Sequence, residues 1–330
     1  MNGRNTMEMT FLQSVSDALR EEMRRDEKVF LLGEDMGVYG GCFGVTRGFL
    51  DEFGEERVMD TPISEGGFTS VAVGAAMAGY RPVVEYMFSD FVTVAMDPIC
   101  NQAAKQRFML GGQVKMPLVV RTPAGSGTGA AAQHSQSLEA WFCHVPGLKV
   151  VMPSTPYDVK GLLKAAIRED NPVLFYEHKL LYGTKGEVPE EEYTLPIGKA
   201  DVKREGGDIT MISYSLTLLK TLEAAKMLEK DGIDAEVIDL RTLSPIDRDT
   251  LIASAKKTGR VLVTHESVEK FGVGAEISAM LSDSDAFFYL DRPIRRFGGA
   301  DMPIPYSPQL ESMVVPQADT IYQAAKELLK

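Results

Sequence analysis

This sequence of 330 residues lacks long apolar runs, has few cysteines and carries no excess of basic residues. No apolar stretch reaches the roughly 20 residues that cross a bilayer, and the start, MNGRNTMEMTFLQ, has neither the basic region nor the apolar core of a signal peptide. Cys42, Cys100 and Cys143 are odd in number and follow no metal or disulfide spacing. We therefore expect a protein of the reducing cytoplasm.

The charge balance argues against nucleic acid or an anionic membrane as the main partner. The chain has 35 basic and 47 acidic residues, a net charge of −12, whereas proteins that bind such surfaces usually present a basic face. Its 44% hydrophobic and 25% charged residues are typical of globular domains, and the length allows two cores. Small molecules and proteins are the expected partners.

Buried strands alternate with helices in the first part of the chain. Thr10 and Gln13 form a capping-box pattern that predicts a helix over 10–26. Apolar strands are expected at 29–35, 81–87, 116–123, 148–153 and 172–177, with helices at 66–79, 91–109 and 156–169. This order predicts an α/β fold with a parallel sheet covered on both faces, and ligands in such folds bind at the carboxyl ends of the strands.

A second, smaller α/β domain is predicted after a stretch rich in charge, proline and glycine. We place the first domain at 1–190, a linker at 191–206 and the second domain at 207–330. The second domain's expected strands are 208–214, 235–240 and 260–266, and its expected helices are 217–231, 247–256 and 320–330.

Several residues near expected strand ends could carry chemistry, each with a simpler explanation beside it. The loop GEDMGVYGGCFG (33–44) lacks the spacing of a phosphate-binding motif, and its glycines can serve backbone conformation alone. Glu65 starts a helix, where an acid is favoured by the helix dipole even without a function. Phe88 and Phe91 are either core residues or the lining of a planar ligand's site.

The histidines divide in a similar way. His134 follows a glycine-rich loop after an expected strand, and imidazole exchanges protons near neutral pH, although a loop histidine is often an ordinary polar contact. No G-x-S-x-G elbow surrounds Ser135 or Ser137, which argues against a serine hydrolase. His144, His178 and His265 have no partner at metal-ligand spacing, and we expect them to be structural.

Five blocks of the sequence resemble one family in order and in spacing. They are GEDMGVYGGCFGVTRGF, RVMDTPISEGGF, GAAMAGYRPVVEYMF, AAQHSQSLEAWFCHVPGLKVVMPSTPYDVKGLL and VIDLRTLSPID. The chain thus resembles, over about residues 8–328, the beta subunit of the thiamine-diphosphate-dependent decarboxylating component of 2-oxo-acid dehydrogenase complexes. The resemblance implies a transketolase-like fold, in which a pyrimidine-binding domain precedes a transketolase C-terminal domain.

The resemblance also implies partners. In the family, an alpha subunit holds magnesium and the diphosphate of the cofactor through a Gly-Asp-Gly segment, and this sequence contains no Gly-Asp-Gly. We therefore expect half a site in this chain, an assembly of two alpha and two beta chains, and transfer of an acyl group to the lipoyl domain of a dihydrolipoamide acyltransferase. The enzyme would be an oxidoreductase active only with its alpha subunit.

The family's site residues carry over to matching positions. Glu65 would hydrogen-bond a pyrimidine nitrogen of thiamine diphosphate and relay the proton that activates the thiazolium, Phe91 would stack on the pyrimidine, and His134 would assist acylation of the lipoyl arm. Some relatives bind potassium through carbonyl oxygens, and the matching positions are Leu118, Ala166, Ile167, Glu169 and Asn171. Glu169 stands where an aspartate is expected, a change that carbonyl ligation tolerates.

Several functions remain open at this stage. Pyruvate and acetoin are the expected substrates, and the segment YEHKLLYGTKGEVPEEEYTLPIGKA looks most like acetoin-cleaving relatives. A branched-chain 2-oxo acid is less expected, because the loop at 85–98 departs from that pattern, notably at Pro98. A homodimeric transketolase-type enzyme would need a Gly-Asp-Gly segment, which this sequence lacks. A non-catalytic scaffold subunit is a further alternative, but it would have no need of Glu65 or His134.

Overall fold

The computed structural model describes residues 5–330, which fold into two compact units. Unit 1 holds the chain up to Ala124 together with Trp141–Ile197, and unit 2 holds Gly125–Ala140 together with Gly198–Lys330. The loop that carries His134 therefore belongs to the second unit, although it lies within the predicted first domain. No helix among residues 5–330 combines the length and apolarity needed to span a membrane.

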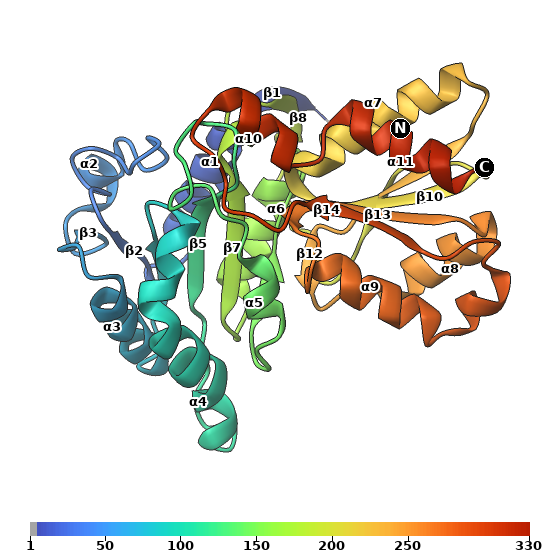
Figure 1. Cartoon of the computed structure of the whole chain (residues 1–330). Helices are drawn as coiled ribbons and strands as arrows, with labels where there is room; N and C mark the ends of the chain where they lie inside the picture. Colours follow the sequence, from blue (N-terminus) through green and yellow to red (C-terminus); the bar gives the residue numbers. More distant parts are fainter. Residues whose placement is uncertain (1–4) are drawn as a thin grey trace. The chain divides into compact units, whose positions relative to one another are not determined.

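Unit 1 is built around a parallel sheet (Figure 1). Its strands lie in the order β6-β7-β5-β4-β2-β3, and all neighbouring pairs run parallel. Their bounds are β2 Val29–Gly33, β3 Val58–Asp60, β4 Arg81–Glu85, β5 Val119–Ala124, β6 Lys149–Val151 and β7 Val173–His178. The Val, Leu and Phe side chains of these strands are buried, as the continuous apolar runs predicted.

Helices cover both faces of this sheet (Figure 1). Helix α1 (Phe11–Arg25) packs against α6 (Pro156–Arg168), while α3 (Glu65–Met77) packs against β4 and the helical turns before α4 (Ala104–Met109). The predicted capping box is confirmed, because Thr10 and Gln13 exchange both of its hydrogen bonds. The shorter elements are α2 Phe49–Phe53, α5 Glu139–Cys143, η3 Lys179–Leu181 and a two-stranded ribbon of β1 Thr6–Thr10 with β8 Lys185–Pro189.

Residues 91–109 are helical as predicted, but they do not form one regular α-helix. The structure has a 3₁₀ segment, η1 (Ser89–Ala95), a π-helical segment, η2 (Pro98–Ala103), and then α4. Pro98 has no N–H to donate and its ring crowds the preceding turn, so a regular α-helix cannot pass through it. The change of helix type matters because it places Phe91 on the short η1 segment.

Unit 2 has a five-stranded sheet in the order β14-β13-β10-β11-β9. The strands are β9 Asp201–Arg204, β10 Ile209–Ser213, β11 Ala235–Asp239, β13 Val261–Val268 and β14 Arg295–Gly299. The short β12, Thr242–Ser244, is not a strand of this sheet. Strand β9 is antiparallel to β11 and lies inside the predicted linker, where the sequence analysis expected no strand. The domain boundaries themselves stay a prediction.

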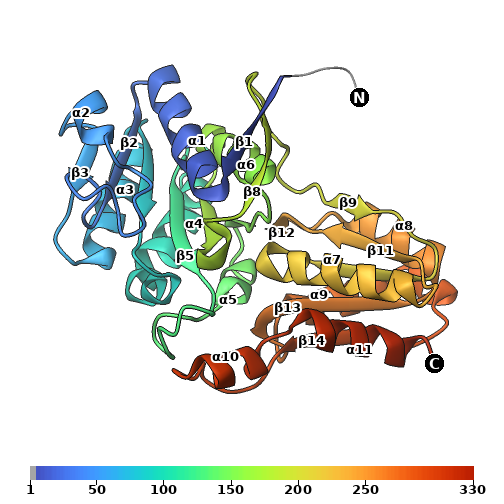
Figure 2. The same ribbon diagram turned by 90° about the horizontal axis from the view of Figure 1, so that it is seen from above.

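Helices of unit 2 also cover two faces, with α7 (Ser215–Lys230) and α11 (Ala318–Leu328) side by side on one and α8 (Arg248–Thr258) and α9 (Val273–Ser282) on the other (Figures 1 and 2). Ile209, Leu218, Leu262 and Ile321 form part of the core between the sheet and the first pair. The remaining helical segments are η4 Asp285–Tyr289 and α10 Pro308–Val314.

Candidate active site

Glu65 is the first residue of α3 and is 6% exposed. The turn before it is tied to the end of β2, because the Thr61 N–H donates to the Gly33 carbonyl at 2.9 Å. A side chain at Gly66 would lie 3.2 Å from the Val94 carbonyl oxygen, so the glycine lets η1 approach the first turn of α3. The structure thus places a buried carboxylate at the carboxyl end of the sheet, in contact with the element that carries Phe91.

Glu34 lies beside Glu65 and was not singled out by the sequence. It follows β2 directly, is 5% exposed, and its Oε1 has no hydrogen-bond partner among residues 5–330. Burial, and then the negative charges of Glu65 and Asp35, raise the pKa of Glu34 above that of an ordinary glutamate. A buried oxygen without a partner in its own chain can exchange a hydrogen bond with a polar atom of a ligand.

The glycine-rich loop after Glu34 closes over a buried ion cluster. Gly40, Gly41 and Gly44 all have φ of +81°, and a side chain at Gly41 would lie 2.7 Å from Glu85 Oε1. Glu85 pairs with the fully buried Arg121, which also forms a two-pronged bond to Glu177 at 2.8 and 2.7 Å. Backbone conformation and close packing therefore account for these glycines, as the simpler explanation had it.

Phe91 is half-buried and belongs to a chain of aromatic rings. Its ring meets that of Phe88 edge-to-face, with centroids 6.1 Å apart and an interplanar angle of 85°. Phe88 in turn contacts Phe43 at 6.0 Å and lies 5.2 Å from the Lys179 ammonium. Phe88 is thus a packing partner of Phe91, while Phe91 keeps part of its ring accessible.

His134 lies in unit 2 on the loop Gly125–Ala140 and is half-buried. A turn precedes it, in which its N–H donates to the Ala131 carbonyl at 3.4 Å and Ala131 has a left-handed φ of 61°. His134 is thus the candidate site residue of unit 2. Glu65 and Phe91 form the part in unit 1.

The other histidines have structural environments or lie at the surface. His265 is fully buried between Ser267 and the Gly274 N–H, and burial lowers its pKa to about 4. His178 accepts from the Leu180 N–H at 3.2 Å and so caps η3, while His144 is exposed. Within residues 5–330 no group of three or more His, Cys, Asp or Glu side chains could hold a metal.

Four of the five carbonyl oxygens predicted to bind potassium, those of Leu118, Ala166, Ile167 and Glu169, already accept hydrogen bonds. Arg81 donates to the carbonyl oxygens of Ile167 at 2.9 Å and Glu169 at 3.1 Å, and the Leu118 carbonyl accepts from the Val173 N–H at 2.9 Å. Each carbonyl oxygen has a second lone pair, but the Arg81 guanidinium is a fixed cation at two of these positions and would repel another. These oxygens alone therefore fit an added cation poorly.

Two family models match the chain. The pyrimidine-binding domain of transketolase matches residues 7–185, and the C-terminal domain of transketolase matches residues 198–321. Among solved structures, a split-gene transketolase described as an inactive beta4 tetramer superposes with a TM-score of 0.80 at 24% identity, covering 99% of both chains. A transketolase from Pichia stipitis superposes with a TM-score of 0.71 at 14% identity, and the match covers 98% of this chain and 46% of the transketolase chain. These likenesses support the transketolase-like fold.

Sequence relatives are closer. The 2-oxoisovalerate dehydrogenase subunit beta of Bacillus subtilis is 50% identical, covering 97% of this chain and 98% of that protein. A mitochondrial pyruvate dehydrogenase E1 component subunit beta-2 of Oryza sativa is also 50% identical, and the match covers 97% of this chain and 86% of the rice protein. The pyruvate dehydrogenase E1 component subunit beta of Rickettsia felis is 47% identical, covering 98% of both. Identity alone does not separate the two substrate types.

Proposed function

The chain belongs to the beta subunits of the thiamine-diphosphate-dependent 2-oxo-acid dehydrogenases, which share the transketolase fold, and from this premise we propose how its residues act. We propose that Glu65 and Phe91 bind the pyrimidine half of the cofactor and that His134 serves acyl transfer to a lipoyl domain. The observation that carries this proposal is the buried Glu65 carboxylate, held at the start of α3 beside Phe91's segment.

The side chains of unit 1 suit a planar, basic heterocycle. When bound, thiamine diphosphate supplies a carbon nucleophile and an electron sink for cleavage next to a carbonyl. Glu65 would hold a proton against a ring nitrogen, and burial strengthens that hydrogen bond because water does not compete for it. Glu34 offers an unpartnered oxygen in the same place, and the accessible part of Phe91 offers a flat surface for stacking.

We propose that an alpha subunit covers this half-site and supplies the rest of it. Val38 and Ile63, in the loop after β2 and the turn after β3, are 83% and 84% exposed. Large apolar side chains exposed on the loops that follow strands β2 and β3 fit a surface that another chain covers. The alpha subunit would hold the magnesium and diphosphate, since this sequence has no Gly-Asp-Gly to do so. The proposed assembly has two chains of each kind and works in the cytoplasm with a lipoyl acyltransferase.

The substrate is proposed as pyruvate, with acetoin as the second candidate. Relatives named for pyruvate and for 2-oxoisovalerate are equally identical to this chain, at 50%. We place 2-oxoisovalerate last only because of the loop sequence at 85–98, notably Pro98. A purely structural subunit is disfavoured, because a scaffold gains nothing from burying Glu65 and Glu34 side by side.

The chain alone is expected to bind thiamine diphosphate negligibly, because the half that anchors the diphosphate is absent from it. Titration calorimetry with thiamine diphosphate and magnesium should give no measurable heat for this chain and clear binding after assembly with the alpha subunit. The assembled enzyme should then turn over pyruvate or acetoin faster than 2-oxoisovalerate. Tight binding by the isolated chain, or preference for 2-oxoisovalerate, would contradict the respective part of the proposal.

We propose that a bound potassium ion would have to share the carbonyl oxygens of Ile167 and Glu169 with the Arg81 guanidinium. If the ion uses the second lone pairs of Ile167 and Glu169, replacing potassium by sodium should lower the melting temperature of the assembled enzyme. An unchanged melting temperature would mean that the Arg81 guanidinium alone balances these oxygens.

A further inference from the structure

The loop that carries His134 closes on itself but has little packing of its own. Its base is tied by the Gly125 N–H, which donates to the Gln136 carbonyl at 3.4 Å. The twelve residues from 125 to 136, GSGTGAAAQHSQ, contain no side chain larger than histidine or glutamine and no bulky apolar one. Compact loops of this length are usually held by their own side chains, so the order of this loop must come from elsewhere.

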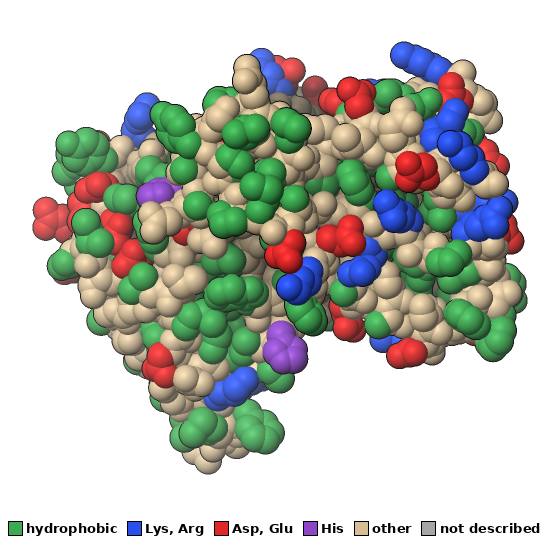
Figure 3. Space-filling view, in the orientation of Figure 1, with side chains coloured by type: hydrophobic (Ala, Val, Ile, Leu, Met, Phe, Trp, Pro, Cys, Tyr) green, Lys and Arg blue, Asp and Glu red, His purple; other side chains and the backbone are tan. Residues whose placement is uncertain are grey.

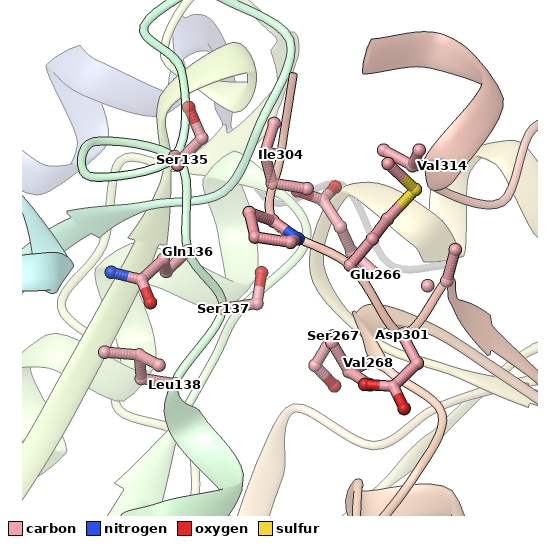
Figure 4. A pocket seen from close by; sticks show the side chains of 15 residues that line it. Ser135, Gln136, Ser137, Leu138, Glu266, Ser267, Val268, Asp301, Ile304 and Val314 are labelled. Atoms are coloured by element: carbon pink, nitrogen blue, oxygen red, sulfur yellow. The ribbon is translucent and has the colours of Figure 1, made fainter. Parts of the chain in front are cut away.

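One side of the loop's return limb faces open space. Ser135, Gln136 and Ser137 line a cavity of about 350 Å³ within unit 2, across from Glu266 and Ile304 (Figure 4). The Ser135 side chain is 1% exposed, yet its hydroxyl has no hydrogen-bond partner among residues 5–330. The segment next to His134 therefore borders the cavity, and the Ser135 hydroxyl adds no hydrogen bond that would hold it there.

Two buried carboxylates hold the outward limb of the loop instead. Glu311 is 2% exposed and accepts hydrogen bonds from the Gly127 N–H at 2.6 Å and the Gly129 N–H at 3.2 Å, one on each oxygen. Glu266, also buried, accepts from the Ser126 N–H at 2.6 Å. Gly127 and Gly129 have φ of 98° and 68°, a conformation in which glycine turns these N–H groups toward the acids without strain.

Both acids stand on fixed parts of unit 2. Glu266 is on β13, the eight-residue strand that lies between β14 and β10. Glu311 is on α10, whose end is anchored to the strand region after β14 because the Ala300 N–H donates to the Val314 carbonyl at 2.8 Å. Charge-assisted bonds to backbone N–H groups, made in a buried place, are among the stronger hydrogen bonds in proteins. The pair therefore fixes the loop to the sheet of unit 2.

We propose that Glu266 and Glu311 are positioning residues for His134, acting through the backbone of the 125–136 loop. This inference rests on the role proposed for His134 in acyl transfer. Without the two acids the glycine-rich limb would sample other conformations, and the imidazole would lose its fixed place. The acids would touch neither cofactor nor substrate, so the step that uses the lipoyl domain should suffer alone.

The test uses the enzyme assembled with its alpha subunit and two acceptors, a lipoyl domain and an artificial redox dye. Glu311→Gln leaves one acceptor oxygen where the carboxylate has two, and Glu311→Ala leaves none. Both should lower kcat/KM for the lipoyl domain, the alanine variant by about 10- to 100-fold, as expected for a catalytic group misplaced by about 1 Å. Dye reduction should stay near the wild-type rate. Glu236→Gln is the matched control, because Glu236 is a buried carboxylate of unit 2 bonded to Ser254 and Lys257, away from the loop.

A double-mutant cycle separates positioning from general damage. In a His134→Ala background, Glu311→Ala should cause little further loss of lipoyl transfer, since no imidazole remains to be placed. Additive losses, or an unchanged lipoyl rate in Glu311→Ala, would overturn the inference. If Glu311→Ala fails to assemble, the inference is tested with Glu311→Gln and with amide hydrogen exchange of the wild-type enzyme. Fast exchange of the Gly127 and Gly129 amides would also overturn the inference. A wild-type enzyme without transfer to the lipoyl domain would instead refute the proposed function.

Discussion

Glu65→Gln is expected to lower turnover of the assembled enzyme by about 100- to 10,000-fold, the contribution typical of a positioned proton-transfer group. The variant keeps the size and the hydrogen-bonding oxygen of glutamate, but its amide cannot take up and return a proton. Because Glu65 is buried beside Glu34, solvent cannot easily replace it. Exchange of the cofactor's thiazolium proton for deuterium, followed by NMR after acid quench, should slow in parallel with turnover.

The simpler explanation for Glu65 is that it is only a first-turn acid, and a matched variant tests that explanation. Glu276 is an exposed acid in the first turn of α9, so Glu276→Gln makes the same chemical change at another helix start. A first-turn acid stabilises its helix by about 0.3–1 kcal/mol and affects no chemical step. If Glu65→Gln behaved like Glu276→Gln, with a small change in stability and normal deuterium exchange, the proposed role of Glu65 would be refuted.

The strands with continuous apolar runs could be predicted from the sequence, and those without such runs could not. β2, β4, β10 and β11 were all expected, because strands buried on both faces must be apolar along their length. β14, with the sequence RRFGG, has no such signal and is a strand only because it pairs with β13 at the edge of the sheet. The intrinsic β-propensity of such residues is weak, so pairing with a neighbouring strand determines whether they form a strand.

The candidate site also has parts that could be predicted from the sequence and parts that could not. Local pattern placed Glu65 at a helix start and left its function open, and the resemblance to a family supplied its role. Glu34 stood in the sequence as part of a glycine loop, and its importance became visible only when the fold placed its buried oxygen beside Glu65. Glu311 lies 184 residues from Gly127, and no spacing rule links a helix carboxylate to a loop N–H at that separation.

The exposure of some apolar side chains could not be predicted from the sequence either. Phe108, Met109 and Leu110 are exposed at the end of α4, where Figure 3 shows hydrophobic side chains gathered at the lower edge of the view. In the sequence these consecutive apolar residues stand at the end of the helix predicted over 91–109, and nothing in them indicates exposure. Periodicity shows which residues share a face but not what covers that face. An exposed apolar surface can therefore have the same sequence pattern as a core.

His134→Ala is expected to separate the two half-reactions of the enzyme. Reduction of an artificial dye should continue at most of its wild-type rate, because the dye takes electrons without docking through the His134 loop. Transfer of the acyl group to a lipoyl domain should fall by about 100-fold, the loss seen when one charge-stabilising donor is removed from a transition state. Steady-state assays of the same preparation with each acceptor would measure both rates.

The imidazole's contribution depends on its ability to carry a proton or positive charge next to sulfur as the lipoyl disulfide opens, and a second substitution tests that cause. His134→Asn keeps a hydrogen-bond donor on the loop but cannot become cationic, so its lipoyl rate should stay close to that of His134→Ala. His144→Ala is the control, because His144 is an exposed histidine of unit 1 and should leave both rates unchanged. Equal losses with dye and lipoyl domain would place His134 in the shared decarboxylation step instead. Full activity of His134→Asn would mean that donation of a hydrogen bond is sufficient, and that the charge of the imidazole is not used.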